Sequence, residues 1–191
     1  MLRRLFSRTP QDPRPAAIYA AIVAASRQPA FYTSFGIADT VEGRFELLVL
    51  HAGLVTLRLS GGSEVDRALS QAVFDLMFAD LDRGLRELGV GDLSVPKKIR
   101  KMAEAYYGRA RAYAAALGDD APAEALTAVI ARNVYDPETE APAAAVVGAL
   151  AAYVRVSHGR MATAEPERLR QGEVGFPNAS DYEPEPVVAA S

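Results

Sequence analysis

Residues 41–59, with the sequence VEGRFELLVLHAGLVTLRL, constrain the fold of this chain more than any other segment. Apolar residues occupy most sides of this segment when it is drawn as a helix. A helix that is apolar on most sides is normally covered by other elements, which keep water away from its surface. Its β-branched residues also fit a strand, but its length favours a helix. We therefore expect a buried central helix inside a bundle.

Helical spacing of apolar residues predicts further helices before and after this central one. The expected helices cover residues 16–26, 41–59, 64–88, 96–117, 122–132 and 143–156. Ser63 with Asp66 fits the start of the third helix, and Gly89 fits its C-terminal end. Asp39 with Glu42 resembles a capping box before the central helix. The predicted fold class is all-α.

The composition divides the chain into three parts. Residues 1–13 form a short basic N-terminal arm, and residues 14–160 form one helical domain of about six helices. From about Thr163 onward, Glu, Pro and Gly replace the apolar periodicity. Residues 161–191 are therefore expected to be a flexible, disordered tail that is acidic and contains proline. The prediction is a single-domain bundle with two loose ends.

The composition also excludes several classes of function. The chain has 191 residues and no cysteine, which rules out disulfides, thiolate nucleophiles and cysteine zinc sites. Its two histidines, His51 and His158, are too few for a multi-histidine metal site. The net charge of −3 gives no general attraction to DNA. No Ser-His-Asp set, phosphate loop or paired-carboxylate signature is present, so we expect no enzyme activity, no cofactor and no metal.

Two segments bear on membrane contact. The longest nearly apolar run, residues 142–154, is too short and too rich in alanine for a spanning helix. The arm MLRRLFSR is not followed by an apolar core of signal-peptide length. Its Leu2, Leu5 and Phe6 fit shallow insertion, although so short an arm gives little affinity alone. We expect a soluble cytoplasmic protein, with peripheral contact to the inner membrane left open.

All three lysines of the chain lie at the start of the expected helix over residues 96–117. The basic residues of this helix are Lys97, Lys98, Arg100, Lys101, Arg109 and Arg111; with one acid, they give it a charge of +5 and leave −8 for the remainder. The N-terminal end of a helix disfavours positive charge, by about 0.3–1 kcal/mol per exposed group. Three explanations stay open: a solvated outer face, pairing with acids of the helix over 64–88, or docking to rRNA phosphates, anionic lipid headgroups or an acidic protein.

Aromatic residues before the central helix have both a binding and a structural interpretation. Phe31 and Tyr32 either line a groove for an apolar client segment or plug the end of the bundle. Plugging is favoured, because aromatic side chains dominate protein cores. Arg44 either pairs with Asp39 or Glu42 or reaches a partner, and Asp39 is expected to serve as a helix cap.

Two further residues need an interpretation. Tyr106 falls on the apolar stripe of the helix over 96–117, while its neighbour Tyr107 is free to contact a partner. His51 lies in the middle of the most apolar helix, with no second histidine near it in the sequence. Such a histidine is expected to be a hydrogen-bonded core residue rather than a metal or haem ligand.

Five stretches carry a resemblance to a known family. They are PAFY (29–32), DTVEGRFELLVLH (39–51), FADLDRGLRELGVGDLSVPKKIRKM (78–102), YYGRARAY (106–113) and, more weakly, ARNVY (131–135). Together they resemble the ubiquinol–cytochrome c chaperone family, the assembly factors for the cytochrome b subunit of ubiquinol–cytochrome c reductase. The block around LRELGVGDLSVPKKIRKM is the most specific part. The cysteine-free, Ala- and Arg-rich composition resembles a bacterial member.

The resemblance implies a non-enzymatic helper that binds newly made cytochrome b and assists assembly of the reductase. Mitochondrial relatives work near the ribosomal tunnel exit with a small partner protein, so a ribosome, an anionic membrane surface and a small partner protein are further expected partners. The expected binding residues, on an apolar groove and a cationic helix face, are Lys97, Lys98, Arg100, Lys101, Arg109, Arg111, Phe31, Tyr32, Arg44 and Tyr107. The alternatives are a membrane or ribosome docking module without a client and, third, an enzyme acting on a hydrophobic substrate.

Overall fold

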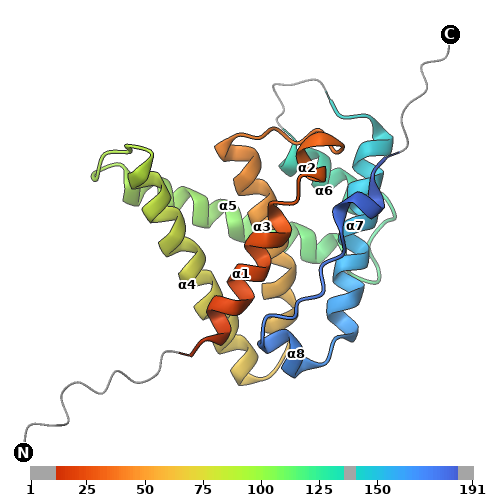
Figure 1. The fold of residues 1–191 in the computed structure, drawn as a ribbon. Coiled ribbons are helices and arrows are strands. Elements are labelled where there is room, and N and C mark those ends of the chain that lie inside the picture. The colour runs from red at the N-terminus through yellow and green to blue at the C-terminus, as the bar shows by residue number, and fades with distance from the viewer. Residues whose placement is uncertain (1–11, 136–140, 185–191) are drawn as a thin grey trace, which may run out of the picture.

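The computed structural model describes residues 12–135 and 141–184, and these residues form helices and no strand (Figure 1). The helices are α1 (Arg14–Ser26), α2 (Ala30–Thr33), α3 (Val41–Ser60), α4 (Glu64–Glu87), α5 (Val95–Ala116), α6 (Ala125–Val134), α7 (Ala144–Thr163), α8 (Pro166–Arg170) and the 3-10 helix η1 (Ala179–Tyr182). The predicted all-α, single-domain fold is confirmed. None of the described helices is long and apolar enough to cross a membrane. Residues 1–11 of the expected arm and 185–191 of the expected tail lie outside the described residues.

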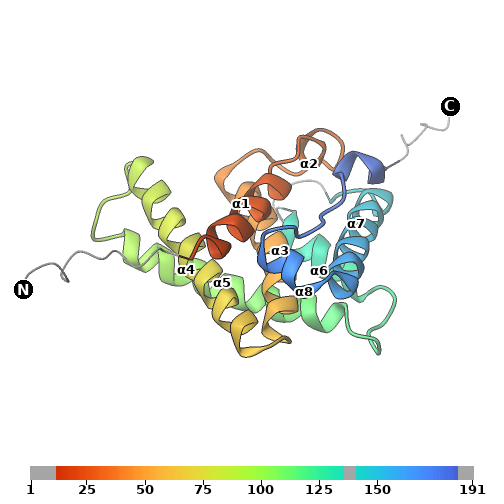
Figure 2. The same cartoon turned by 60° about the horizontal axis from the view of Figure 1, so that its bottom comes forward.

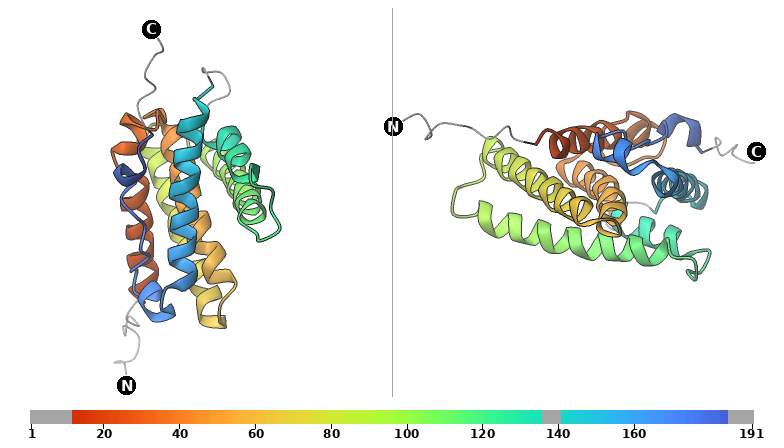
Figure 3. Two further views of the ribbon diagram at one scale, coloured as in Figure 1. Left: turned by 90° about the vertical axis from the view of Figure 1, so that its right-hand side faces the viewer. Right: turned by 90° about the horizontal axis from the view of Figure 1, so that it is seen from below.

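Helix α3 runs through the middle of the bundle, as its apolar sequence predicts. It contacts α1, α4, α5, α6 and α7, and every residue from Leu47 to Thr56 is buried. Seen from below, α5 lies on one face of α3 and α1 lies on the opposite face (Figure 3). The bundle therefore has α3 as its core element, and the surrounding helices bury its middle part, residues 47–56.

The start of α4 carries the cap that its sequence predicts. The hydroxyl of Ser63 accepts a hydrogen bond from the backbone N–H of Asp66, and the Asp66 carboxylate accepts one from the N–H of Ser63 at 2.9 Å. Gly89 follows the end of α4 with a φ of +80°, a conformation that favours glycine. Both local signals were therefore sufficient to place the ends of this helix.

The start of α3 differs from the prediction. Thr40, not Asp39, is the cap residue, and its hydroxyl accepts a hydrogen bond from the N–H of Gly43 at 3.1 Å. Asp39 accepts a hydrogen bond from Arg44 instead, at 3.0 Å. The physical reason is the backbone, because Thr40 has the extended conformation that a cap residue needs.

Two other helices have different bounds from those expected. Helix α6 begins at Ala125 and not at residue 122, because residues 122–124 form a turn in which the carbonyl of Pro122 accepts from the N–H of Ala125. Helix α7 continues to Thr163, one and a half to two turns beyond the expected end at residue 156. Its last turns bury Met161 in the core, which extends the apolar face past the part that the sequence pattern marked.

Helices α4 and α5 form an antiparallel hairpin whose outer end projects from the bundle. Figures 1 and 2 show the connecting loop far from α7, at the outer edge of the molecule. We call residues 88–101, which are this loop and the first two turns of α5, the hairpin tip. The inner end of the hairpin packs against α3, whereas the tip extends beyond it.

The segment expected to be flexible from about Thr163 packs on the bundle as far as residue 184, which corrects that expectation. Leu169, Val174 and Ala179 are buried in the core of the molecule. The segment, which we call the C-terminal segment (residues 164–184), crosses the face formed by α1 and α7 (Figure 1). Its few apolar anchors follow no helical period, so composition alone suggested disorder.

Close contact with α1 depends on Gly172 of the C-terminal segment. This residue has a φ of +89°, and a Cβ atom there would lie 2.8 Å from the backbone carbonyl carbon of Ala17. The side-chain amide of Gln28 also holds the segment, because it donates to the carbonyl of Pro177 at 3.2 Å and accepts from the N–H of Ala179 at 2.7 Å. Backbone proximity and paired amide hydrogen bonds therefore fix this segment, whose regular structure is limited to the short helices α8 and η1.

Candidate partner-binding surfaces

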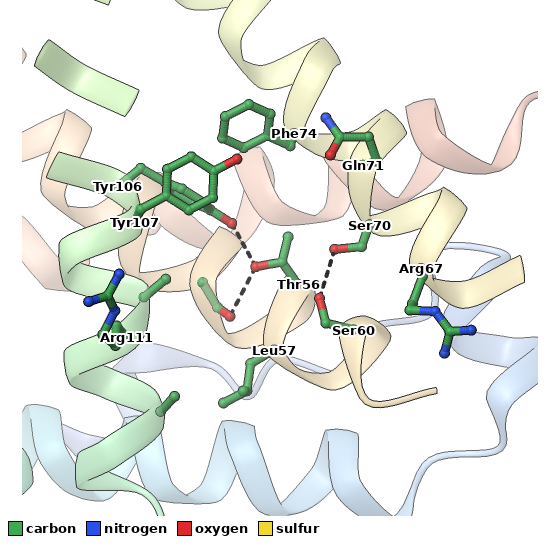
Figure 4. Close-up of a pocket in the computed structure, with 13 residues that line it drawn as sticks. Thr56, Leu57, Ser60, Arg67, Ser70, Gln71, Phe74, Tyr106, Tyr107 and Arg111 are labelled. Carbon is green, nitrogen blue, oxygen red and sulfur yellow. Dashed lines mark hydrogen bonds between the residues drawn. The ribbon is translucent and has the colours of Figure 1, made fainter. Parts of the chain in front are cut away.

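Helices α3, α4 and α5 border an open groove of about 500 Å³, which we call the α5 groove (Figure 4). Small residues contribute to its lining: Gly53 of α3 faces Ala110 of α5, and Ala114 lies one turn further along α5. Phe74 of α4 and Tyr107 of α5 form one aromatic end of the lining. The groove therefore combines small and aromatic apolar residues with polar side chains, and it is open to solvent.

The floor of the α5 groove is held by internal hydrogen bonds. The Thr56 hydroxyl donates to the carbonyl of Ala52 at 2.9 Å, so it accepts from the hydroxyl of Tyr106, which lies 2.6 Å away (Figure 4). Burial raises the pKa of Tyr106 to about 12, which keeps this hydroxyl protonated as a donor. The hydroxyls of Ser60 and Ser70 pair at 3.3 Å. These bonds satisfy the polar atoms of the floor within the bundle.

An aromatic cluster links the groove to the core. The ring of Phe74 lies 5.3 Å from the rings of both Tyr106 and Tyr107, and 4.5 Å from the ring of Phe78. Tyr106 is buried, as predicted, whereas about half of Tyr107 is exposed. Tyr107 therefore presents an aromatic surface to any segment that enters the groove, and its ring packs against the ring of Phe74.

Two arginines flank the groove on opposite sides (Figure 4). Arg67 donates to the carbonyl of Gly62 at 2.8 Å, which holds its side chain near the start of α4. Arg111 lies on the exposed face of α5 and forms no ion pair with any carboxylate of the described residues. These guanidinium groups are suited to carbonyl or carboxylate oxygens of a bound segment.

The cationic residues predicted on α5 fall into separate places. Lys97, Lys98, Arg100 and Lys101 are exposed on the hairpin tip, outside the α5 groove. Arg100 pairs with Glu104 at 3.1 Å, and no described carboxylate forms an ion pair with any of the lysines. The alternative of pairing with acids of α4 is therefore not what the described residues show.

Arg109 does not belong to the exposed cationic face. Its guanidinium donates to the Glu46 carboxylate of α3 at 2.6 Å, and both side chains are largely buried. Burial raises the pKa of Glu46, although the bond from Arg109 opposes this shift. The pair joins α3 to α5 inside the bundle, so Arg109 contributes to packing rather than to a docking surface.

Phe31 and Tyr32 lie on the short helix α2 and not in a loop. Phe31 is completely buried, with its ring 5.4 Å from the ring of His51 and 5.2 Å from that of Tyr153. Tyr32 is half-buried, and its hydroxyl donates to the carbonyl of Ser26. The structure thus corrects the groove interpretation of Phe31, because this side chain plugs the bundle.

Arg44 borders a second groove, which the sequence did not predict. This groove of about 340 Å³ lies between the starts of α3 and α5 and the end of α4, with Phe45, Leu81 and Leu88 among its apolar residues. Arg44 itself pairs with exposed Asp39. The sequence contained one signal for this second groove, because Leu88 is a large apolar residue directly before the turn at Gly89. Local periodicity did not predict which helices surround this groove.

His51 is a buried core residue with both ring nitrogens satisfied, as the sequence predicts. Its Nδ1–H donates to the carbonyl of Leu47 at 2.7 Å, and its Nε2 accepts from the hydroxyl of Tyr153 at 2.8 Å. Burial lowers the pKa of His51 to about 4, so the ring is neutral near pH 7. Within the described residues, no group of three or more His, Asp or Glu side chains is placed to hold a metal ion.

Comparison with known proteins agrees with the helical arrangement. The model of the ubiquinol–cytochrome c chaperone family matches residues 33–176, from the end of α2 into the C-terminal segment. The crystal structure of the Cbp3 homolog from Brucella abortus is similar with a TM-score of 0.77 and 38% sequence identity, over 87% of this chain and 90% of that chain. No curated protein matches the sequence. The chain belongs to the ubiquinol–cytochrome c chaperone family.

Proposed function

We propose that this chain assists the assembly of ubiquinol–cytochrome c reductase by holding a segment of newly made cytochrome b in the α5 groove. Family membership supports the role in reductase assembly. The observation that carries the client site is the groove itself, an open channel with small residues at its base, aromatic rings at one end and an arginine on each side. Such a lining suits an extended or helical apolar segment.

The chemistry of the lining supports binding without a strong sequence requirement. Phe74 and Tyr107 offer a large aromatic area, and aromatic side chains contribute much of the binding energy at interfaces. Arg67 and Arg111 can pair with backbone carbonyls that an unfinished membrane segment leaves without partners. A client would therefore be shielded from water along its apolar side and hydrogen-bonded by the arginines on both sides of the groove.

The same lining argues against catalysis in the groove. Its titratable side chains are arginines and tyrosines, and the described residues place no carboxylate, histidine or cysteine in it. General acid–base catalysis at neutral pH needs a group whose pKa lies near the working pH, and Tyr106, with a pKa of about 12, does not meet this requirement. We therefore propose that the groove binds its client and does not transform it.

A matched pair of substitutions on α5 tests the client site. Ala114 lines the groove, whereas Ala115, one residue later on the same helix, is exposed outside it. Ala114→Asp places a charge in the groove and should lower the amount of assembled cytochrome b, measured by its absorbance spectrum in membranes of a strain that carries only this variant. Ala115→Asp adds the same charge at the same end of the helix and should leave the spectrum unchanged.

Deletion of the gene provides the outer limit of this effect. Assembled cytochrome b should fall while its messenger RNA stays normal. Unchanged cytochrome b spectra in the deletion strain would sink the proposed function. If deletion lowers assembled cytochrome b but the spectra of Ala114→Asp and Ala115→Asp are equal, the α5 groove is not the client site.

The cationic tip leaves room for a second partner. Because Lys97, Lys98 and Lys101 lie outside the α5 groove, a ribosome, an anionic membrane or a small partner protein can bind them while the groove is occupied. A docking module without a client is the alternative function, and the exposed charges of the tip are what favours it. The spectra of the groove variants separate the two, because a docking module does not need the groove.

A further inference from the structure

We propose that the hairpin tip docks on an anionic lipid bilayer, with Leu88 and Leu93 inserted among the headgroups and the neighbouring basic side chains on the lipid phosphates. This inference does not depend on the client or on the α5 groove. It rests on the exposure of the two leucines, on the charge around them and on the position of the tip at the edge of the molecule.

No residue in the described part of the chain buries Leu93. Its side chain is 98% exposed, the highest value among the exposed large apolar side chains of the described residues. It occupies the position before the cap residue Ser94, where an apolar side chain usually packs on the fourth residue of the helix. Here that fourth residue is Lys98, so the usual apolar contact is replaced by a charge. Exposing a leucine in this way gains nothing for the fold.

Leu88 adds a second apolar group on the other side of the same loop. It is 65% exposed and follows the last residue of α4. The turn at Gly89, with its positive φ, lets the chain reverse between the two leucines. Figures 1 and 2 place this loop at the outer end of the α4–α5 hairpin, so a flat surface can approach it without meeting the rest of the bundle.

The charge of the tip suits an anionic surface. Residues 88–101 contain four basic side chains and one acid, which gives a net charge of +3 in a chain whose total is −3. The one acid, Asp92, is paired with Arg86 of α4. No acidic residue lies in the first turn of α5, so the lysines there are also unfavourably placed for the helix dipole. Phosphate groups of lipids would compensate both the lysines and the helix terminus.

Lipid fits the tip better than RNA does. Proteins that bind single-stranded RNA stack its bases on aromatic side chains, and the tip has none between residues 88 and 101. Isolated leucines surrounded by lysines are instead the composition of segments that insert shallowly into a charged membrane surface. The combination of apolar apex and basic surround therefore favours a bilayer.

A tryptophan reporter tests insertion directly, since the chain has no tryptophan of its own. Leu93→Trp places a single indole at the apex, and Val65→Trp places one at an exposed apolar position at the opposite end of α4. With vesicles of phosphatidylcholine and phosphatidylserine, emission should shift to the blue for Leu93→Trp and stay constant for Val65→Trp. No shift at position 93 would overturn the proposal, even if the protein bound vesicles through another segment.

Vesicle sedimentation measures how much each group contributes. Leu93→Asp should lower the partition coefficient of the full-length protein by about tenfold or more, and Val65→Asp should change it less than about twofold. Simultaneous reversal of Lys97, Lys98 and Lys101 to Glu should abolish the preference for phosphatidylserine. Circular dichroism checks that these exposed substitutions leave the helices intact.

Three results would count against the bilayer. The first is wild-type protein that never sediments with anionic vesicles. The second is equal binding to vesicles of pure phosphatidylcholine, because the lysines would then have no role. Binding to purified ribosomes that is lost on lysine reversal but indifferent to Leu93→Asp, without any vesicle binding, would assign the tip to RNA instead. Loss of vesicle binding in both Leu93→Asp and the lysine variant, with normal binding by Val65→Asp, supports the proposal.

Discussion

The two ends of the α4–α5 hairpin contrast with each other. At the inner end, Asp66 of α4 receives hydrogen bonds from Arg170 of the C-terminal segment, and Tyr113 of α5 is buried in the core. At the outer end, Leu93 and the lysines of the tip face solvent. The inner end is therefore fixed by residues that are distant in the sequence, whereas the outer end is fixed by burial of Val95 at the start of α5 and leaves its loop and lysines exposed. The contrast separates what stabilises the fold from what is available to a partner.

The largest expected effect comes from truncating one aromatic side chain at the inner end. Tyr113→Ala should lower the free energy of unfolding by about 3–5 kcal/mol, because it leaves a cavity next to α3. Leu93→Ala at the tip should change it by less than about 0.5 kcal/mol, since this side chain is 98% exposed. Urea unfolding followed by circular dichroism measures both. Comparable losses for the two variants would break the contrast between the ends.

A second prediction concerns the ion pair that ties α4 to the C-terminal segment. Asp66 is almost fully buried and pairs with Arg170 at 2.8 Å. Asp66→Asn keeps an oxygen for the cap but removes the charge that Arg170 contacts, so it should cost about 2–3 kcal/mol of unfolding free energy at neutral pH. Asp75 on the same helix is exposed and accepts only from the side chain of Gln71, so Asp75→Asn should cost little.

The stabilisation by the Asp66–Arg170 pair should decrease at low pH. The hydrogen bonds from Arg170 and Ser63 hold the pKa of the Asp66 carboxyl well below its ordinary value of 3.8. The stabilisation is therefore complete above that value and is lost as the pH falls below it, when the unfolded chain takes up a proton first. The difference between wild type and Asp66→Asn should shrink in this acidic range. A difference that stays constant would mean that the charge of Asp66 does not stabilise the fold.

The smallest predicted effect sharpens the description of the α5 groove. Tyr106→Phe removes the hydroxyl that donates a hydrogen bond to Thr56 at 2.6 Å. It should cost about 1 kcal/mol of unfolding free energy. Tyr107→Phe, at the half-exposed neighbouring position, should be close to neutral. Thermal unfolding of the two variants tests whether the floor is stabilised by this bond. If both variants behave alike, the Thr56 bond does not contribute to stability.

Local signals in the sequence were enough for most of the helical framework. The apolar run of α3, the cap formed by Ser63 and Asp66, and the glycine after α4 each act over a few residues, so they can be read without the fold. The misplaced cap at Asp39 shows the limit of this approach. Two adjacent residues, Asp39 and Thr40, both have cap chemistry, and only the backbone conformation decides between them.

Most features of the candidate surfaces were less accessible from the sequence. Tyr107 and Arg111 line the α5 groove as the helical projection allows, but Arg109 is occupied by Glu46, which is distant in the sequence. Phe31 is buried because α7 supplies Tyr153 beside it. Such pairings depend on how the helices pack, and periodicity along one helix contains no information about its neighbours. The C-terminal segment was missed for the same reason.

The C-terminal segment also sets the order in which the molecule can be completed. A ribosome makes α1, α3 and α4 first, so Gln28, His51 and Asp66 emerge long before their partners Ala179, Phe176 and Arg170. The earlier helices must collapse with one face still uncovered, and docking of the segment is the closing step. The reverse step is the easiest partial opening, because the segment has few buried anchors and little regular hydrogen bonding. Amide exchange in residues 174–178 should thus be fast, while the helices that border the α5 groove stay closed.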